Sequence, residues 1–228
     1  MASRRGDAGA ARDLTRLLVL LDVDGTLFLT HDPLAGEAMG ETLEERFDVR
    51  LAPDAMNAVD HAGQTSLRIA RLVLERAGVA AGPIDEGLAG WCARFGARYL
   101  ELLDATDTSA WEPAPDAAAA LGRLESGDHR LALLTGNPEP MARARMERLG
   151  LDRFFAPGQG AFGCDSEARA ELIAIARARA GGWPAEATAE IGDTARDVSS
   201  ACEAGIRSIL VGTAGLAGAV AKLLAAPE

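Results

Sequence analysis

The chain has 228 residues, of which 48% are hydrophobic and 25% are charged, and its formal net charge at pH 7 is −11. This apolar fraction can build a hydrophobic core, which excludes wholesale disorder, and the length suits one medium domain or a core carrying a smaller insertion. The acidic balance argues against nucleic acid or an anionic membrane as the main partner, although a local site can still bind an anionic substrate.

The N-terminal segment and the cysteines indicate where the protein works. Residues 1–13 are polar and rich in small residues, and we predict a flexible lead-in there. The apolar run Leu17–Leu21 is too short for a signal-peptide core or a membrane span. Cys92, Cys164 and Cys202 are odd in number, far apart and in no CxxC spacing, which favours free thiols in a reducing compartment. We therefore expect a cytoplasmic protein.

The first predicted element is the short buried strand Leu17–Leu21, and strands alternate with helices again from about residue 106. The later strands are expected at Arg130–Leu134, at a segment ending in Ala189–Ile191, and at Ser208–Val211. The helices between them are expected at Asp116–Glu125, Pro138–Leu149, Glu167–Ala180 and Ala195–Ala204. Because this alternation forms a parallel sheet with helices on both faces, we predict an α/β, Rossmann-like core made of residues 14–32 and 106–228.

Residues 33–105 break this alternation and contain no convincing strand. Their apolar residues recur at helical spacing, in one series at Leu67, Ala70, Leu74 and Ala77 and in another at Leu88, Trp91, Phe95, Tyr99 and Leu102. The second series is typical of a helix face buried in a core. We therefore predict an all-helical cap domain, inserted between the first strand and the rest of the sheet.

The sharpest chemical signal is Asp22-Val23-Asp24-Gly25-Thr26, directly after the first strand. In an open α/β sheet, ligands bind beyond the carboxyl ends of the strands, where this loop must lie. Two acids on one turn can supply a nucleophile and an acid/base to the same substrate. Taken alone, the segment is equally typical of an Asp-Gly turn with solvated carboxylates.

Two further segments are expected at the same edge. Thr135-Gly136-Asn137 follows a strand and leads into a helix, so its hydroxyl and backbone N–H groups can hold phosphoryl oxygens, although such residues also serve as helix caps. Arg169 is predicted in the first turn of a helix, where a cation is electrostatically misplaced unless an anion lies beside it. A solvated arginine is the alternative.

The last segment, Gly192-Asp193 through Asp197, carries two acids four residues apart that can share a face at a helix start. Together with Asp22 and Asp24 they form an acidic cleft. Two bare carboxylates about 4 Å apart repel by roughly 4 kcal/mol at an effective dielectric of 20, so the cluster needs a cation. Oxygen ligands with a phosphate as co-ligand favour Mg²⁺.

These segments in combination resemble the haloacid dehalogenase superfamily, in particular its phosphoglycolate phosphatase-like branch with a helical cap, from Leu17 to Gly212. The resemblance implies a Mg²⁺-dependent phosphatase that hydrolyses a small, phosphoglycolate-like phosphomonoester. One residue departs from the pattern, because most members have lysine where this chain has Arg169. Arginine keeps the charge but is longer, planar and bidentate.

The resemblance also implies a role for each residue. Asp22 attacks phosphorus to form an aspartyl phosphate, and Asp24 protonates the leaving oxygen and later activates water. Asp22, Asp193 and the backbone carbonyl of Asp24 bind Mg²⁺, with support from Asp197. Thr135, Gly136 and Asn137 bind the phosphoryl group, and Arg169 balances its charge. The segment His61–Arg68 resembles the cap loop that closes over the site, which assigns Gln64, Thr65 and Arg68 to the substrate; an ordinary helix start is the alternative.

Other functions use overlapping features. A 2-haloacid dehalogenase has no use for an acid at Asp24, because a halide leaves without protonation, whereas a phosphomutase uses the same segments. A nucleotide-binding module is suggested by the GxGxxG pattern Gly158–Gly163, but it follows only a weak strand, Phe154–Phe155, and no acidic strand end comes about 20 residues later. We interpret these glycines as a loop that lets Arg169 approach the site. A catalytically inactive binding protein is a further alternative, and the oligomeric state is not readable.

Overall fold

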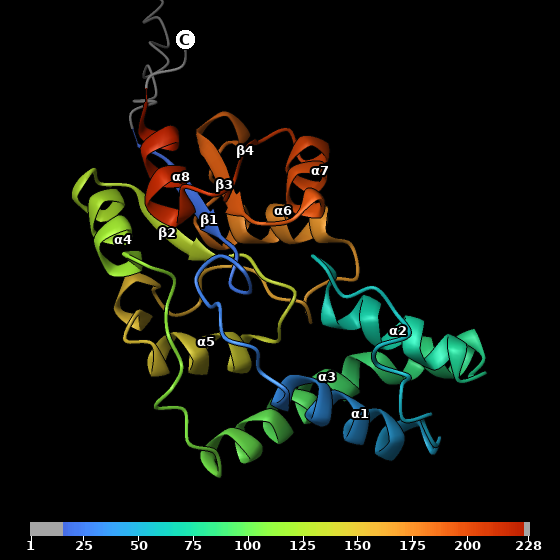
Figure 1. The fold of residues 1–228 in the computed structure, drawn as a ribbon. Coiled ribbons are helices and arrows are strands. Elements are labelled where there is room, and N and C mark those ends of the chain that lie inside the picture. Colours follow the sequence, from blue (N-terminus) through green and yellow to red (C-terminus); the bar gives the residue numbers. More distant parts are fainter. Residues whose placement is uncertain (1–15, 226–228) are drawn as a thin grey trace, which may run out of the picture.

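The computed structural model describes residues 16–225 (Figure 1). The lead-in predicted at residues 1–13 lies outside this range. The sheet of the core contains β1 (Leu18–Leu21), β2 (Arg130–Leu133), β3 (Thr188–Gly192) and β4 (Arg207–Leu210). All pairings are parallel and the order is β2-β1-β3-β4. The loops that follow β1, β2 and β3 therefore leave the sheet at one edge.

Helices cover both faces of this sheet, as predicted for the α/β core. They are α4 (Ala117–Ser126), α5 (Glu139–Arg148), α6 (Arg169–Arg179), α7 (Ala195–Glu203) and α8 (Gly215–Leu224). Because side chains alternate along a strand, Val19 and Leu21 of β1 pack on the side of α4, α5 and α8, whereas Leu18 and Leu20 pack on the side of α6 and α7. Helix α8 is an addition that the sequence pattern did not suggest.

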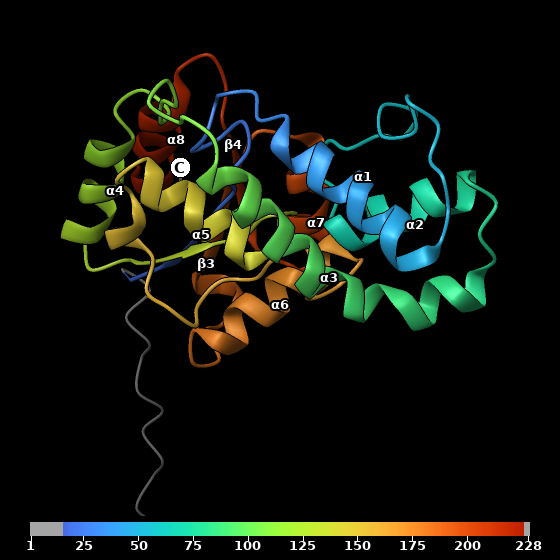
Figure 2. The ribbon, with the colours of Figure 1, turned by 90° about the horizontal axis from the view of Figure 1, so that it is seen from below.

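The insert is all-helical, as predicted. It consists of α1 (Leu34–Phe47), α2 (Ser66–Arg76) and α3 (Ala81–Asp104), which lie together beside the core in Figures 1 and 2. The insert has its own hydrophobic core, in which Trp91 stacks on Phe95 and donates a hydrogen bond to Thr42. Helix α3 packs against α5, whose Met141 belongs to the same cluster. The boundaries 33–105 for a separate cap domain remain a prediction.

The glycine-rich segment Gly158–Gly163 does not begin a dinucleotide-binding unit. The weak strand expected at Phe154–Phe155 is absent, and a 3₁₀ turn, Asp152–Phe154, takes its place. Instead, Ala161 extends the edge of the sheet: its N–H donates to the carbonyl of Leu133, and its carbonyl accepts from the N–H of Thr135. The segment thus supports the turn at the end of β2.

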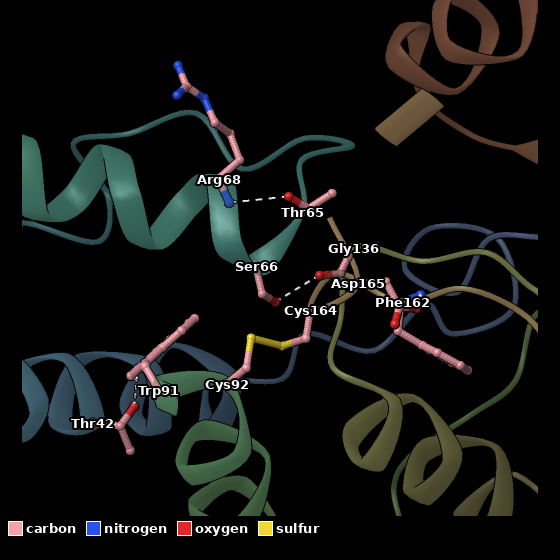
Figure 3. The surroundings of a disulfide bond; sticks show 10 residues. All are labelled: Thr42, Thr65, Ser66, Arg68, Trp91, Cys92, Gly136, Phe162, Cys164 and Asp165. Atoms are coloured by element: carbon pink, nitrogen blue, oxygen red, sulfur yellow. Dashed lines mark hydrogen bonds between the residues drawn. A yellow bond between two sulfur atoms is a disulfide. The ribbon is translucent and has the colours of Figure 1, made fainter. Parts of the chain in front are cut away.

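The prediction of three free thiols is wrong. Cys92 of α3 and Cys164 of the loop before α6 form a disulfide with a Cα–Cα distance of 5.9 Å (Figure 3), whereas Cys202 is free and exposed. The packing of α3 against the core brings together residues 72 positions apart, which sequence spacing does not report. The cysteines therefore no longer argue for a reducing compartment. Between residues 16 and 225, no helix is long and apolar enough to cross a membrane.

The disulfide should contribute to stability, because it closes a long loop between insert and core. Replacing both Cys92 and Cys164 by serine should lower the free energy of unfolding by about 2–4 kcal/mol, measured by urea denaturation without reductant. Cys202→Ser is the control and should change it by less than about 0.5 kcal/mol. A double variant as stable as the wild type would contradict the pairing.

Candidate active site

A cavity of about 490 Å³ opens where the edge of the sheet faces the insert. Eight of the residues proposed from the sequence line it: Asp22, Asp24, Gln64, Thr135, Gly136, Asn137, Arg169 and Asp193. Asp197 lies buried behind the wall, and Thr65 and Arg68 do not line the cavity. Parallel strand ends and one loop of the insert thus assemble the cavity from segments distant in sequence.

Three carboxyl groups form a compact cluster at the base of the cavity. Asp22, Asp193 and Asp197 each offer an oxygen, and these oxygens lie within 4.8 Å of one another. Gly25 permits this approach, because its φ is +79° and a Cβ at that position would overlap the carboxylate of Asp193. The loops after β1 and β3 can therefore meet only with glycine at this position.

Arg169 lies inside the carboxylate cluster and is buried. Its Nη2 lies 3.0 Å from Asp22 Oδ1 and 2.6 Å from Asp197 Oδ1. The same nitrogen lies 3.4 Å from Glu190 Oε1. One guanidinium is thus shared by three carboxyl groups, which accounts for a cation at the start of α6.

Glu190 was missed by the sequence analysis. It lies on β3 with no exposed surface, and burial raises its pKa to about 8 against the opposing effect of Arg169. A fully buried glutamate is rare unless it is paired. The signal was present, because an acid stands in the middle of the buried segment Thr188–Gly192.

One guanidinium does not neutralise this cluster. Burial raises the pKa of Asp22 to about 8, with Arg169 opposing and Asp197 adding to the rise. Burial also raises the pKa of Asp193, again reinforced by Asp197. In addition, Asp193 Oδ1 is buried and has no hydrogen-bond partner among the described residues. An unpaired oxygen in an all-carboxylate donor set fits a hard cation such as Mg²⁺.

Asp197 joins the helix start to this cluster. Its Oδ2 accepts hydrogen bonds of 2.8 Å from both the N–H and the hydroxyl of Thr194, and the Thr194 hydroxyl accepts from the Asp197 N–H, which completes a capping box at α7. Its other oxygen, Oδ1, faces Arg169. Asp197 therefore caps helix α7 with one carboxylate oxygen and contacts Arg169 of the cluster with the other.

Asp24 is held from both sides and remains half exposed. Its Oδ1 accepts a 2.8 Å hydrogen bond from Arg145 Nη1, and its Oδ2 accepts one from the Asn137 amide. Arg145 is buried in α5 and also binds Asp32 Oδ2 at 2.7 Å and the hydroxyl of Tyr99 at 3.2 Å. This network joins the acid to the segment before α1, which leads into the insert, and to α3 of the insert. Sequence reasoning missed Arg145 and Asp32 and treated Tyr99 as core only.

The turn after β2 also holds its neighbours in place. Thr135 is buried, and its Oγ1 accepts hydrogen bonds from the N–H and the side-chain amide of Asn137. Asn137 thus bridges Thr135 and Asp24. A Cβ on Gly136 would overlap the carbonyl of Gln64, so the loop of the insert lies directly on this turn.

The insert residues divide into two groups. Gln64 lines the cavity, and so does Ser66, whose hydroxyl donates a 2.8 Å hydrogen bond to the carbonyl of Gly136 (Figure 3). The hydroxyl of Thr65 instead caps α2 by accepting from the N–H of Arg68, and it donates to the carbonyl of Glu167. Figure 3 shows the Arg68 side chain pointing away from Ser66. Thr65 and Arg68 therefore lie outside the described lining of the cavity, and their positions follow from the helix start.

Solved structures share this fold at low sequence identity. A predicted phosphatase from Clostridium acetobutylicum is 19% identical with a TM-score of 0.58, over 88% of this chain and 86% of the other. CbbY from Rhodobacter sphaeroides, in complex with phosphate, is 18% identical with a TM-score of 0.57, over 86% and 85%. A predicted phosphoglycolate phosphatase from Haemophilus somnus is 19% identical with a TM-score of 0.51, over 88% and 87%. Comparison with curated proteins gave no match.

A sequence model of one family covers most of the chain. It is described as haloacid dehalogenase-like hydrolase and matches residues 17–205. The matched range includes the acidic loop after β1, the insert, the turn after β2, Arg169 and the acids after β3. The chain belongs to the haloacid dehalogenase-like hydrolases.

Proposed function

We propose that this hydrolase is a Mg²⁺-dependent phosphatase that hydrolyses a small phosphomonoester through an aspartyl phosphate on Asp22. The observation that carries the proposal is the cluster of Asp22, Asp193 and Asp197, in which an oxygen of Asp193 is buried and unpaired; Asp22 and Asp193 line the same cavity as the Thr135 turn. The names of similar structures, two predicted phosphatases and a protein bound to phosphate, support the same reaction class.

The proposed chemistry proceeds in two half-reactions. A carboxylate oxygen of Asp22 bonds to phosphorus as the bond between phosphorus and the ester oxygen breaks, and that oxygen takes a proton from Asp24. Water then loses a proton to Asp24 and bonds to phosphorus, and the bond between Asp22 and phosphorus breaks to release phosphate. Arg145 and Asn137 hold Asp24 in place for both proton transfers.

The remaining residues position the phosphoryl group and offset its charge. Thr135 and the N–H of Gly136 would hold its oxygens, and Arg169 would balance charge next to Asp22. Asp22, Asp193 and the backbone carbonyl of Asp24 would hold Mg²⁺, with Asp197 in support. When bound, the ion supplies charge neutralisation at the phosphoryl oxygens.

Phosphate release should depend on the metal, because the carboxyl cluster lacks sufficient counter-charge. EDTA should reduce hydrolysis of nitrophenyl phosphate to background, and Mg²⁺ should restore it. Asp193→Asn should raise the Mg²⁺ concentration needed for half-maximal activity by at least about tenfold. The control Asp104→Asn changes an exposed ion pair and should leave that concentration unchanged. Full activity after exhaustive chelation would contradict the proposal.

The loss of rate caused by replacing Asp24 should depend on the leaving group of the substrate. Asp24→Asn should slow hydrolysis of alkyl phosphates by about 10²–10⁴, and hydrolysis of nitrophenyl phosphate by less, because a good leaving group needs little protonation. Arg145→Lys cannot reach both Asp24 and Asp32, so it should show the same pattern more weakly. Arg143→Lys, in the same helix, should leave the ratio of the two rates unchanged. Equal losses on both substrates would rule out the acid/base role.

Arg169 can be tested together with Glu190. An ammonium cannot contact Asp22, Asp197 and Glu190 together, so Arg169→Lys should lower kcat, by less than the roughly 10²–10³ expected for losing a charged donor altogether. Adding Glu190→Gln removes the carboxylate left unpaired and should restore part of both kcat and the free energy of unfolding. A single Arg169→Lys variant with wild-type kcat and stability would show that charge alone matters.

A further inference from the structure

The outer part of the cavity differs from its base. The core contributes the acids and the Thr135 turn to the lining, whereas the insert contributes the apolar side chains of Met39, Met56, Ile69 and Phe95. The part of the cavity lined by the insert is called the outer part below. Ligand cavities in proteins span roughly 300–1,000 Å³, and this one lies within that range. It is therefore roomier than a two-carbon acid such as phosphoglycolate requires.

Every arginine in the described lining is already paired with carboxyl groups. Arg169 is shared by Asp22, Asp197 and Glu190, and no lysine is among the described lining residues. Arg145 binds Asp24 and Asp32, and its Nε donates to the hydroxyl of Tyr99. No guanidinium in the described lining is thus free to meet a second anionic group on the substrate.

Other polar groups of the outer part suit neutral partners. Gln64, Ser66 and His61 of the insert belong to this lining, together with His31 of the segment before α1. The His61 ring donates a hydrogen bond to the carbonyl of Met56. Amides, hydroxyls and imidazoles bind alcohol groups. A carboxylate or a second phosphate there would lose hydration against the apolar wall, and no unpaired guanidinium or ammonium in the described lining offsets that cost.

We infer that the substrate carries a single phosphate, and that the part enclosed by the insert is an uncharged alcohol with an apolar segment. This rests on the phosphatase activity proposed above and narrows it, because phosphoglycolate carries a second anionic group. It also separates the protein from a phosphomutase. Moving a phosphoryl group within one molecule through Asp22 produces a bisphosphate, and the lining described between residues 16 and 225 offers no free arginine or lysine for its second phosphate.

Matched substrates test the inference. The kcat/KM for hydroxyethyl phosphate should exceed that for phosphoglycolate by about tenfold or more. The kcat/KM for a hexose monophosphate should exceed that for the corresponding bisphosphate by a similar factor. In each pair, the two substrates differ mainly in the second charge. An equal or greater kcat/KM for the doubly anionic members would overturn the inference. Absence of hydrolysis of every ester, nitrophenyl phosphate included, would instead overturn the proposed function.

A variant pair tests the same point from the protein side. Met56 lies half-buried in the segment between α1 and α2, where it lines the cavity and packs against the edge of the hydrophobic cluster of the insert. Met56→Arg should raise kcat/KM for phosphoglycolate relative to hydroxyethyl phosphate several-fold, whereas Met56→Gln, polar but uncharged, should leave the ratio unchanged. If both substitutions moved the ratio equally, charge in the outer part would not set specificity and the inference would be wrong. Circular dichroism of both variants checks that the fold is intact.

Discussion

Carboxyl groups from parallel strands converge at one edge of the sheet, and their mutual repulsion must be offset for the fold to close there. The buried guanidinium of Arg169 performs this task for Asp22, Asp197 and Glu190 at once. Breaking such a buried pair leaves an uncompensated charge, which typically costs about 3–5 kcal/mol. The same contacts place the cation next to the candidate nucleophile, so stability and chemistry depend on one side chain.

A second buried arginine connects this base to the insert. Arg145 binds Asp24, Asp32 of the segment before α1, and Tyr99 of α3. The Ser66 hydroxyl on Gly136 and the disulfide from Cys92 to Cys164 add two further connections between insert and core. The position of the insert is thus coupled to the geometry of the acid/base and of the phosphoryl-binding turn. Both arginines are engaged in these contacts, so neither arginine of the described cavity lining is free to meet a further anionic group.

Arginine at position 169, where the family resemblance implies lysine, is matched by a buried glutamate that it contacts. Arginine is longer and planar compared with lysine, and here it contacts a fully buried glutamate on the neighbouring strand. Glu190 alone would be a costly group in the interior, and Arg169 alone would lack one of its acceptors. The ion pair between Arg169 and Glu190 therefore offsets the cost of burying each charge.

The sequence by itself determined the four strands of the sheet, the helices between them apart from the terminal α8, the helical insert, and the loops that carry the acids. These are local properties, because strands, helix ends and turns follow from apolar spacing and from glycine and proline positions. Tertiary structure alone decided the disulfide, the contacts of Arg145 and Glu190, and the direction of Thr65 and Arg68. Cys92 meets Cys164 because α3 packs against the core at α5, and Arg145 meets Asp24 because α5 lies beside the loop after β1. Such pairings depend on how distant elements pack, and no local spacing in the chain encodes them.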